Sequence, residues 1–264
     1  MPGTRPLLGT VRSVVSSVAV GTGAALAGLV VARGSLPVEP LRRAVDAVGN
    51  YLQTLGTIYA VLLAFVVFVV WSQFNEARAD VHREANDLLD LYRTAGGLPE
   101  GPREKLRSAA RAYAEAVLRH EWSAMGCNDR AAVDQAWAIL DRIWEVAHTY
   151  EPGTKCHEVL HAEVLARVNE LSDARTLRLA ASTLRIPLSL KLLIYTGAVL
   201  TVGSMYLLRV ETAWMHALMT GAVAGAISHI LYIVHDLDDC FAGDWRVSPE
   251  PFERVLAHIQ RATG

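Results

Sequence analysis

A short histidine motif is the first place in the sequence where chemistry could occur. Residues 157–161 read His-Glu-Val-Leu-His, with the two histidines four positions apart on a predicted helix. In zinc proteases a motif of this form lets two histidines on one helix face bind the metal, while the glutamate activates a water molecule. Here His157 and His161 would be the ligands and Glu158 the base. A membrane-tethered zinc protease is therefore one hypothesis for this chain.

The surroundings of this motif favour an ordinary polar helix face. Lys155 and Glu163 place charges beside it, where zinc-protease helices usually carry uncharged or apolar residues. The nearest acidic candidates for a third ligand, Glu170 and Asp173, lie on the same predicted helix, and a rigid helix cannot return them to a metal held at its start. We therefore expect no metal and no cofactor here, and keep the protease as the alternative.

An aromatic face on an uncharged stretch is the second candidate site. Val61, Phe65, Phe68, Ser72 and Asn75 follow one another at spacings of four, three, four and three, which places them on one face of a helix. If several copies of this helix surrounded an axis, rings of phenylalanine would form a hydrophobic constriction that gates by dewetting. Packing against a neighbouring helix is the other interpretation of the same face.

The stretch that carries this face predicts a membrane span. Tyr51 to Asn75 form a run of 25 residues without an ionisable side chain. A helix of this length covers roughly 38 Å, more than the hydrocarbon thickness of about 30 Å. Apolar residues continue beyond the run at helical spacing, at Val81, Ala85 and Leu88. We therefore predict one long helix that leaves the membrane and enters a water-soluble layer.

Three further apolar runs predict three more spans, at residues 13–32, 186–208 and 212–234. Between the second and third spans the sequence is charged and amphipathic, with Gly and Pro at the turns and no period of two. The fold class predicted is all-α: a four-span helical membrane protein with a cytoplasmic antiparallel helical bundle between spans two and three. The predicted domains are 1–75, with the tail and two spans; 76–185, the bundle; 186–234, with two spans; and 235–264, a cytoplasmic C-terminal segment.

Composition and charge agree with an integral membrane protein. Mean hydropathy is +0.25 with 52% hydrophobic residues, and the net charge of −2 with no basic arm argues against nucleic acid as a partner. Arginines flanking the spans are concentrated on the side of the bundle, which predicts a cytoplasmic bundle and cytoplasmic termini in the cell (inner) membrane. The three cysteines are far apart and odd in number, which favours reduced cytoplasmic thiols.

Several short motifs resemble a family of uncharacterised four-span membrane proteins called bestrophin-like, over about residues 45 to 258. The helix after the second span and those that follow carry Glu84, Asn86, Arg93, Glu121 and Trp122. Arg175 and Arg178 precede Pro187, and the closing motif contains Phe241, Gly243 and the run Val-Ser-Pro-Glu-Pro-Phe at 247–252. The family usually has Arg-Pro before the phenylalanine, whereas Asp239 and Cys240 stand here.

This resemblance implies a relative of bestrophins, which are oligomeric anion channels whose second span lines the pore. It predicts a homo-oligomer in a lipid bilayer that passes inorganic ions, with Val61, Phe65, Phe68, Ser72 and Asn75 lining the pore. Two alternatives stay open: the membrane-tethered zinc protease, and a non-conducting membrane scaffold whose bundle binds partners.

Overall fold

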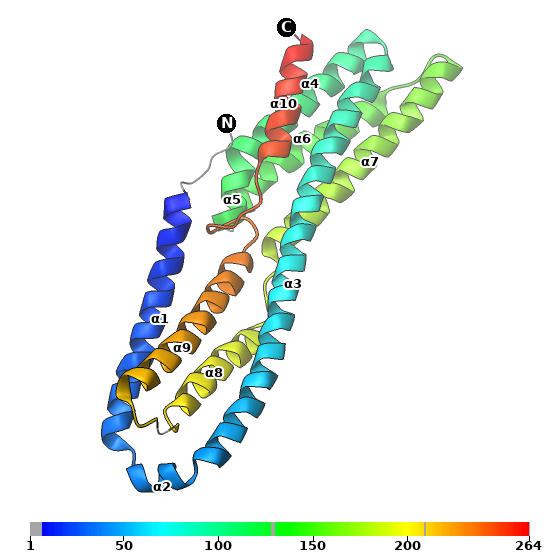
Figure 1. The fold of residues 1–264 in the computed structure, drawn as a ribbon. Coiled ribbons are helices and arrows are strands. Elements are labelled where there is room, and N and C mark those ends of the chain that lie inside the picture. Colours follow the sequence, from blue (N-terminus) through cyan, green and yellow to red (C-terminus); the bar gives the residue numbers. More distant parts are fainter. Residues whose placement is uncertain (1–6, 128–129, 209, 264) are drawn as a thin grey trace. The chain divides into compact units, whose positions relative to one another are not determined.

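Helices are the only regular secondary structure among residues 7–127, 130–208 and 210–263, the parts of the chain that this computed structural model describes (Figure 1). Within these ranges the elements are α1 (Leu7–Ser35), α2 (Val38–Arg43), α3 (Val45–Thr94), the 3₁₀ turn η1 (Ala95–Gly97), α4 (Glu100–Ala116), the π-helical segment η2 (Val117–Glu121), α5 (Trp122–Cys127), α6 (Arg130–Thr149), α7 (Lys155–Thr183), α8 (Leu188–Met205), α9 (Ala213–Leu237) and α10 (Glu250–Thr263). Four helices are long and apolar enough to cross a membrane: α1, α3, α8 and α9.

The chain divides into two compact units. The membrane unit contains the residues up to Ser72 and the segment Arg185–Asp238, and the bundle unit contains Gln73–Leu184 and the chain from Asp239 onward. The C-terminal residues from Asp239 thus group with the bundle. Helix α3 has 50 residues, a length of about 75 Å, and contributes to both units.

Small residues bring α1 and α9 together in the membrane unit. Gly221 and Gly225 of α9 face Thr22 of α1, and a Cβ at Gly21 of α1 would overlap the side chain of Ser228 on α9. Gly28 faces Tyr206 in the same way, and the Tyr206 hydroxyl donates to the Ala25 carbonyl at 2.9 Å. Helices in lipid associate through such close packing, because lipid offers no hydrophobic drive between them. These small residues therefore let α1 and α9 approach closely.

Helices α3 and α8 make a second close contact in this unit. The ring of Tyr59 packs against Gly197, and its hydroxyl donates to the Ile194 carbonyl at 2.8 Å. At the other end of α8, Lys191 Nζ lies 2.5 Å from Asp238 Oδ2, and the Ile186 amide donates to Asp238 at 2.6 Å. The one charge within α8 is therefore paired.

His216 is fully enclosed at the start of α9 and uses both ring nitrogens. Nε2 lies 2.9 Å from the Met205 carbonyl and Nδ1 lies 3.1 Å from Arg33 Nη1. Since a carbonyl only accepts, Nε2 carries the proton and Nδ1 accepts from the guanidinium. Protein groups therefore satisfy both ring nitrogens of this imidazole.

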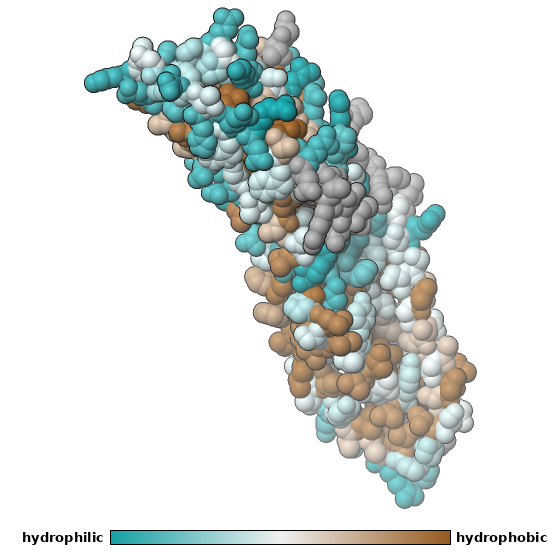
Figure 2. Space-filling model, turned by 180° about the vertical axis from the view of Figure 1, so that it is seen from behind, coloured by the Kyte–Doolittle hydropathy of each residue, from teal (hydrophilic) through white to brown (hydrophobic). Residues whose placement is uncertain are grey.

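Apolar side chains cover much of the outer surface of the membrane unit, whereas hydrophilic side chains cover much of the bundle unit (Figure 2). The bundle unit has its own apolar core, contributed by the last part of α3 together with α4, α6, α7 and α10. Core side chains that are fully buried include Leu88, Leu106, Leu140, Leu171 and Phe252. Thr154 caps α7, because its hydroxyl accepts from the His157 amide at 3.2 Å.

Two local features are absent from the sequence predictions. The segment after α1 contains a short helix, α2, with Pro37 as its extended N-cap and Pro40 in its first turn. Proline is tolerated there because first-turn amides have no partner within the helix. The π-helical segment η2 was not predicted either.

Candidate functional site

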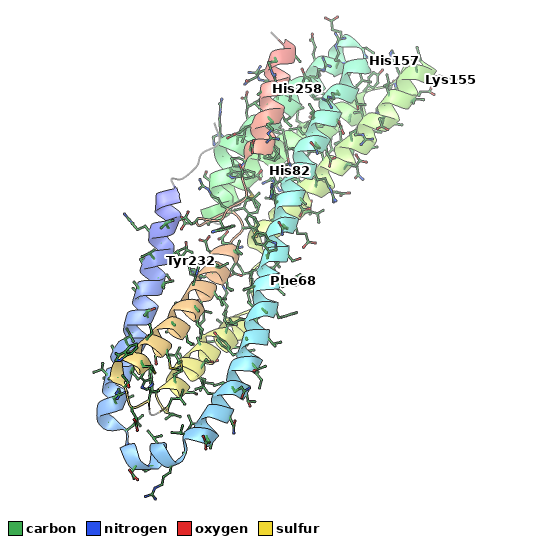
Figure 3. The ribbon with its side chains drawn as sticks, in the orientation of Figure 1. Phe68, His82, Lys155, His157, Tyr232 and His258 are labelled. Atoms are coloured by element: carbon green, nitrogen blue, oxygen red, sulfur yellow. The ribbon has the colours of Figure 1, made fainter. Side chains whose placement is uncertain are left out.

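The aromatic face of α3, made of Val61, Phe65, Phe68, Ser72 and Asn75, is exposed along its whole length. Val61, Phe65 and Phe68 have exposed fractions of 66%, 60% and 67%, and Phe68 is labelled in Figure 3. Ser72 and Asn75 are also exposed. The structure therefore keeps the five residues together on one face, as their spacing indicates, and leaves that face largely uncovered by the described parts of the chain.

The opposite face of α3 is where this chain packs on itself. Tyr59, Leu63, Val66 and Val70 are all buried, and they recur at spacings of four, three and four. The period of the helix thus divides it into a buried, mainly aliphatic side and an exposed side that carries Phe65 and Phe68. Large exposed apolar surfaces mark contact with lipid or with another protein. The aromatic face meets one of these two environments.

A second site is a buried cluster of charged groups in the bundle unit, formed by Glu84, Tyr113, Glu121, Arg175 and Arg178. All five side chains are fully buried. They come from α3, α4, the π-helical segment η2 and α7, so the cluster joins elements far apart in the sequence. Two carboxylates face two guanidiniums, so the cluster has no net charge when all four are ionised.

The hydrogen bonds of this charge cluster form a closed network. Arg175 donates to both oxygens of Glu121, at 2.9 and 2.7 Å. Arg178 donates to Glu121 at 2.8 Å and to both oxygens of Glu84, with Arg178 Nη2 at 3.0 Å from Glu84 Oε1. The Tyr113 hydroxyl donates to Glu84 at 2.5 Å and accepts from Arg175 at 3.2 Å. Such two-pronged contacts between guanidinium and carboxylate are strong and fix geometry.

Local helix geometry explains how these groups converge. Arg175 and Arg178 are three positions apart, so they share one face of α7. That face continues the buried apolar stripe of Val164, Val168 and Leu171. Glu121 ends the π-helical segment, whose wider turn changes the direction in which the following side chains point. Segments of this kind occur often at functional sites.

Burial and neighbouring charges both act on the pKa values of the cluster. Burial lowers the pKa of the Arg178 guanidinium, but Glu84 and Glu121 raise it by more, so the pKa lies well above its usual value. The same balance, with Tyr113 and Glu121 as the raising groups, lifts the pKa of Arg175. Burial raises the pKa of the Tyr113 phenol, and Glu84 raises it further. Both arginines are therefore cationic and Tyr113 is neutral at physiological pH.

Aromatic rings surround the charge cluster. The Arg175 guanidinium lies 4.8 Å from the centre of the Trp137 ring, and that of Arg178 lies 5.9 Å from the centre of the Phe252 ring. Trp122 packs edge-on against Phe241 and Phe252, with ring centres 5.7 and 6.3 Å apart. Cations over ring faces gain further stabilisation when water is excluded.

The motif residues thus separate into two groups. Glu84, Glu121, Trp122 and Phe241 lie in the charge cluster or in the aromatic shell around it. Asn86 is exposed, and Arg93 forms an exposed ion pair with Asp90 at 3.8 Å. Gly243 has a φ of 78°, a left-handed conformation that favours glycine, in the turn after Phe241.

The histidine motif lies at the beginning of α7, where Figure 3 labels Lys155 and His157. His161 Nε2 is 2.8 Å from the Ala147 carbonyl, so this nitrogen carries a proton and is unavailable to a metal. Among the described residues no group of three or more His, Cys, Asp or Glu side chains could hold a metal ion. Within the described residues, His157, Glu158 and His161 therefore do not form part of a metal-binding group.

Comparison with known proteins gives a consistent result. A family model described as the bestrophin-like domain matches residues 19–252. Comparison with curated proteins finds no match.

Solved structures share the fold of this chain. A mutant of a bacterial bestrophin homologue from Klebsiella pneumoniae has a TM-score of 0.67 at 14% identity, covering 94% of this chain and 99% of that one. Another mutant of that homologue has a TM-score of 0.68 at 13% identity, covering 96% of this chain and 99% of that one. A crystal structure described as that of a membrane protein has a TM-score of 0.69 at 14% identity, covering 92% of this chain and 97% of that one. The prediction of an all-helical, four-span membrane protein is confirmed.

Proposed function

Because the bestrophin-like domain covers residues 19–252, the chain belongs to the bestrophin-like family, and we propose that it is an oligomeric ion channel of the cell membrane. In this proposal several copies surround a central axis. Each copy turns the aromatic face of α3 toward that axis. Anions are the expected permeant ions, because the resemblance is to anion channels. The bundle unit and both termini face the cytoplasm, as the distribution of arginines predicts.

The observation that supports this proposal best is the division of α3 into two sides. Its aliphatic side is covered by the same chain, while Val61, Phe65 and Phe68 are left uncovered at 60% exposure or more. Along the same face, Ser72 and Asn75 replace apolar with polar side chains. A pore that narrows at phenylalanines and opens into a polar mouth requires this order of residues.

The proposed pore works through the wetting of a narrow apolar passage. Rings of Phe65 and Phe68 offer no hydrogen bonds to water, so a narrow passage between them empties and stops ions. A small increase in its width lets water and ions enter. Neither side chain has to bind an ion for such a gate to operate.

Currents across planar lipid bilayers test the proposal. Purified protein should pass ionic current, and the double variant Phe65→Ala with Phe68→Ala should pass more current with less closure, because the apolar constriction is removed. Leu192→Ala is the control, since Leu192 is 57% exposed on α8, outside the proposed pore. No current from the wild-type protein over a range of ions and calcium concentrations would rule out the channel.

The oligomeric state provides a separate test. A cysteine at position 65 should crosslink between copies when the protein is oxidised in membranes, because rotational symmetry brings equivalent residues around one axis. A cysteine at position 192 is the matched control and should crosslink much less. A stable monomer in mild detergent without current would favour a membrane scaffold over a channel.

A further inference from the structure

A small basic pocket in the bundle unit lies between the first residues of that unit on α3 and the segment that precedes α10. Its volume is about 220 Å³. Arg78 and His82 of α3 line one side, and Arg246, Ser248 and Glu250 line the other. Figure 3 labels His82 on this part of α3. Buried Val81 and Val247 also line the pocket, so its walls are fixed by the core.

The charges of this basic pocket are unequal. Arg78, His82 and Arg246 face a single carboxylate, that of Glu250. Arg254 already donates to the Glu250 carboxylate, with Nε at 3.0 Å from Oε1. None of Arg78, His82 and Arg246 forms an ion pair or hydrogen bond with a side chain that the structure describes. The pocket therefore has a positive excess and donors without acceptors.

The donors suit a small oxyanion. Guanidinium groups match the oxygens of phosphate through two parallel hydrogen bonds, and an imidazole can add a third donor. The Ser248 hydroxyl accepts from the Glu250 amide at 3.2 Å, which leaves its own hydrogen free to donate toward the pocket. A volume of 220 Å³ is below that of pockets for drug-sized ligands, so it fits one small group and a few waters.

The place of the pocket along α3 indicates where such a group could come from. Arg78 lies one turn beyond Asn75, the last residue of the uncharged run that starts at Tyr51. If that run lies in the hydrocarbon layer, Arg78 and His82 lie at the depth of the lipid headgroups. Phosphate groups occur there in phospholipids, and free phosphate occurs in the solution beyond.

We propose that Arg78, His82, Arg246 and Ser248 form a binding site for a phosphate group, either of an anionic phospholipid or of free phosphate. The site depends on the bundle unit alone, so it stands or falls independently of ion conduction. Its occupation would tie the segment before α10 to α3.

Binding by the full-length protein in neutral detergent tests this proposal. One arm titrates inorganic phosphate and measures binding by equilibrium dialysis. The other arm adds phosphatidylglycerol or phosphatidylcholine and counts retained lipids by native mass spectrometry. We expect the double variant Arg78→Gln with Arg246→Gln to bind at least ten-fold more weakly in whichever arm the wild-type protein binds.

Arg83→Gln is the matched control, since Arg83 is an exposed arginine of the same helix that does not line the pocket. It should bind as the wild-type protein does, and all variants should show the same helical circular dichroism. Binding of phosphate alone identifies free phosphate as the ligand, and selective retention of phosphatidylglycerol identifies the headgroup. The proposal is overturned if the wild-type protein shows neither, or if Arg83→Gln loses as much binding as the double variant.

Discussion

The membrane unit and the bundle unit differ in where they place large side chains and charged side chains. In the membrane unit, Gly21 and Gly225 lie at the helix contact while Phe65 and Phe68 lie outside. In the bundle unit, large apolar side chains lie inside together with two arginines and two glutamates that are fully buried. Helix α3 follows both patterns in turn, since it presents phenylalanine outward in one unit and buries Glu84 in the other.

The difference follows from the surroundings of each unit. Lipid is as apolar as a protein interior, so burying a large side chain gains little there, and close contact between backbones contributes more. In water, apolar burial drives folding, and buried charges are tolerated only when each is paired and hydrogen-bonded. The charge cluster meets this condition, because every carboxylate oxygen of Glu84 and Glu121 accepts at least one hydrogen bond.

Removing one charge from the cluster should have the largest effect on stability. Arg178→Met leaves Glu84 buried without its guanidinium, and we expect a loss of about 3–5 kcal/mol in the free energy of unfolding. Chemical unfolding in detergent, followed by circular dichroism, measures it. Arg93→Met is the control, since Arg93 pairs with Asp90 on the surface of α3 and should change stability by less than about 1 kcal/mol. Equal losses in the two variants would show that the cluster is no more important than a surface pair.

A large side chain at the contact between α1 and α9 should have the second largest effect on stability. Gly21→Leu places a side chain against Ser228 of α9, and we expect overpacking to lower stability by about 1–3 kcal/mol. Gly23→Leu lies two residues away on α1, with no other atom within 4 Å of an added Cβ, and should be tolerated. Thermal unfolding in the same detergent compares them. If both variants unfold at the same temperature, the packing of α1 against α9 does not depend on this contact.

Removing the phenolic hydroxyl should have a smaller effect, within the bundle unit. Tyr113→Phe deletes the donor to Glu84 at 2.5 Å, and we expect a loss of about 1–2 kcal/mol at neutral pH. The raised pKa of Tyr113 gives this loss a pH dependence. The unfolded phenol ionises near pH 10 while the folded one stays neutral, so the stabilising contribution is complete below pH 10 and falls as pH rises further.

Unfolding measured from pH 8 to pH 11.5 checks this sign. The difference in free energy of unfolding between the wild-type protein and Tyr113→Phe should shrink above pH 10. A stability difference that grows as the pH rises would contradict the raised pKa of Tyr113.

Shortening the aromatic face should affect stability least. Phe65→Ala and Phe68→Ala remove side chains that touch little of their own chain, so the unfolding free energy of a single chain should change by less than about 0.5 kcal/mol. A fall in the stability of the assembled oligomer alone would place these residues in contact between copies. A large loss in the isolated chain would mean that the face packs within one chain.

The long elements could be predicted from the sequence because each is encoded locally. Uncharged runs predicted four spans, and glycines and prolines predicted the turns of the bundle; α3 stops at Thr94, just before Gly96 and Gly97. The charge cluster could not be predicted in the same way. The buried stripe of α7 continues from Leu171 to Arg175 and Arg178, which was a signal that these arginines point inward, but their partners lie 54 to 94 positions earlier.

The sequence by itself determined which helices exist and which faces of them are apolar, because hydropathy and helical period are properties of neighbouring residues. It also placed Val61, Phe65 and Phe68 on one face of α3. Only the tertiary structure decided that Glu84 and Glu121 meet Arg175 and Arg178, and that His161 is occupied by the Ala147 carbonyl. These pairings depend on how helices far apart in the chain pack against one another, and many contacts together determine that packing.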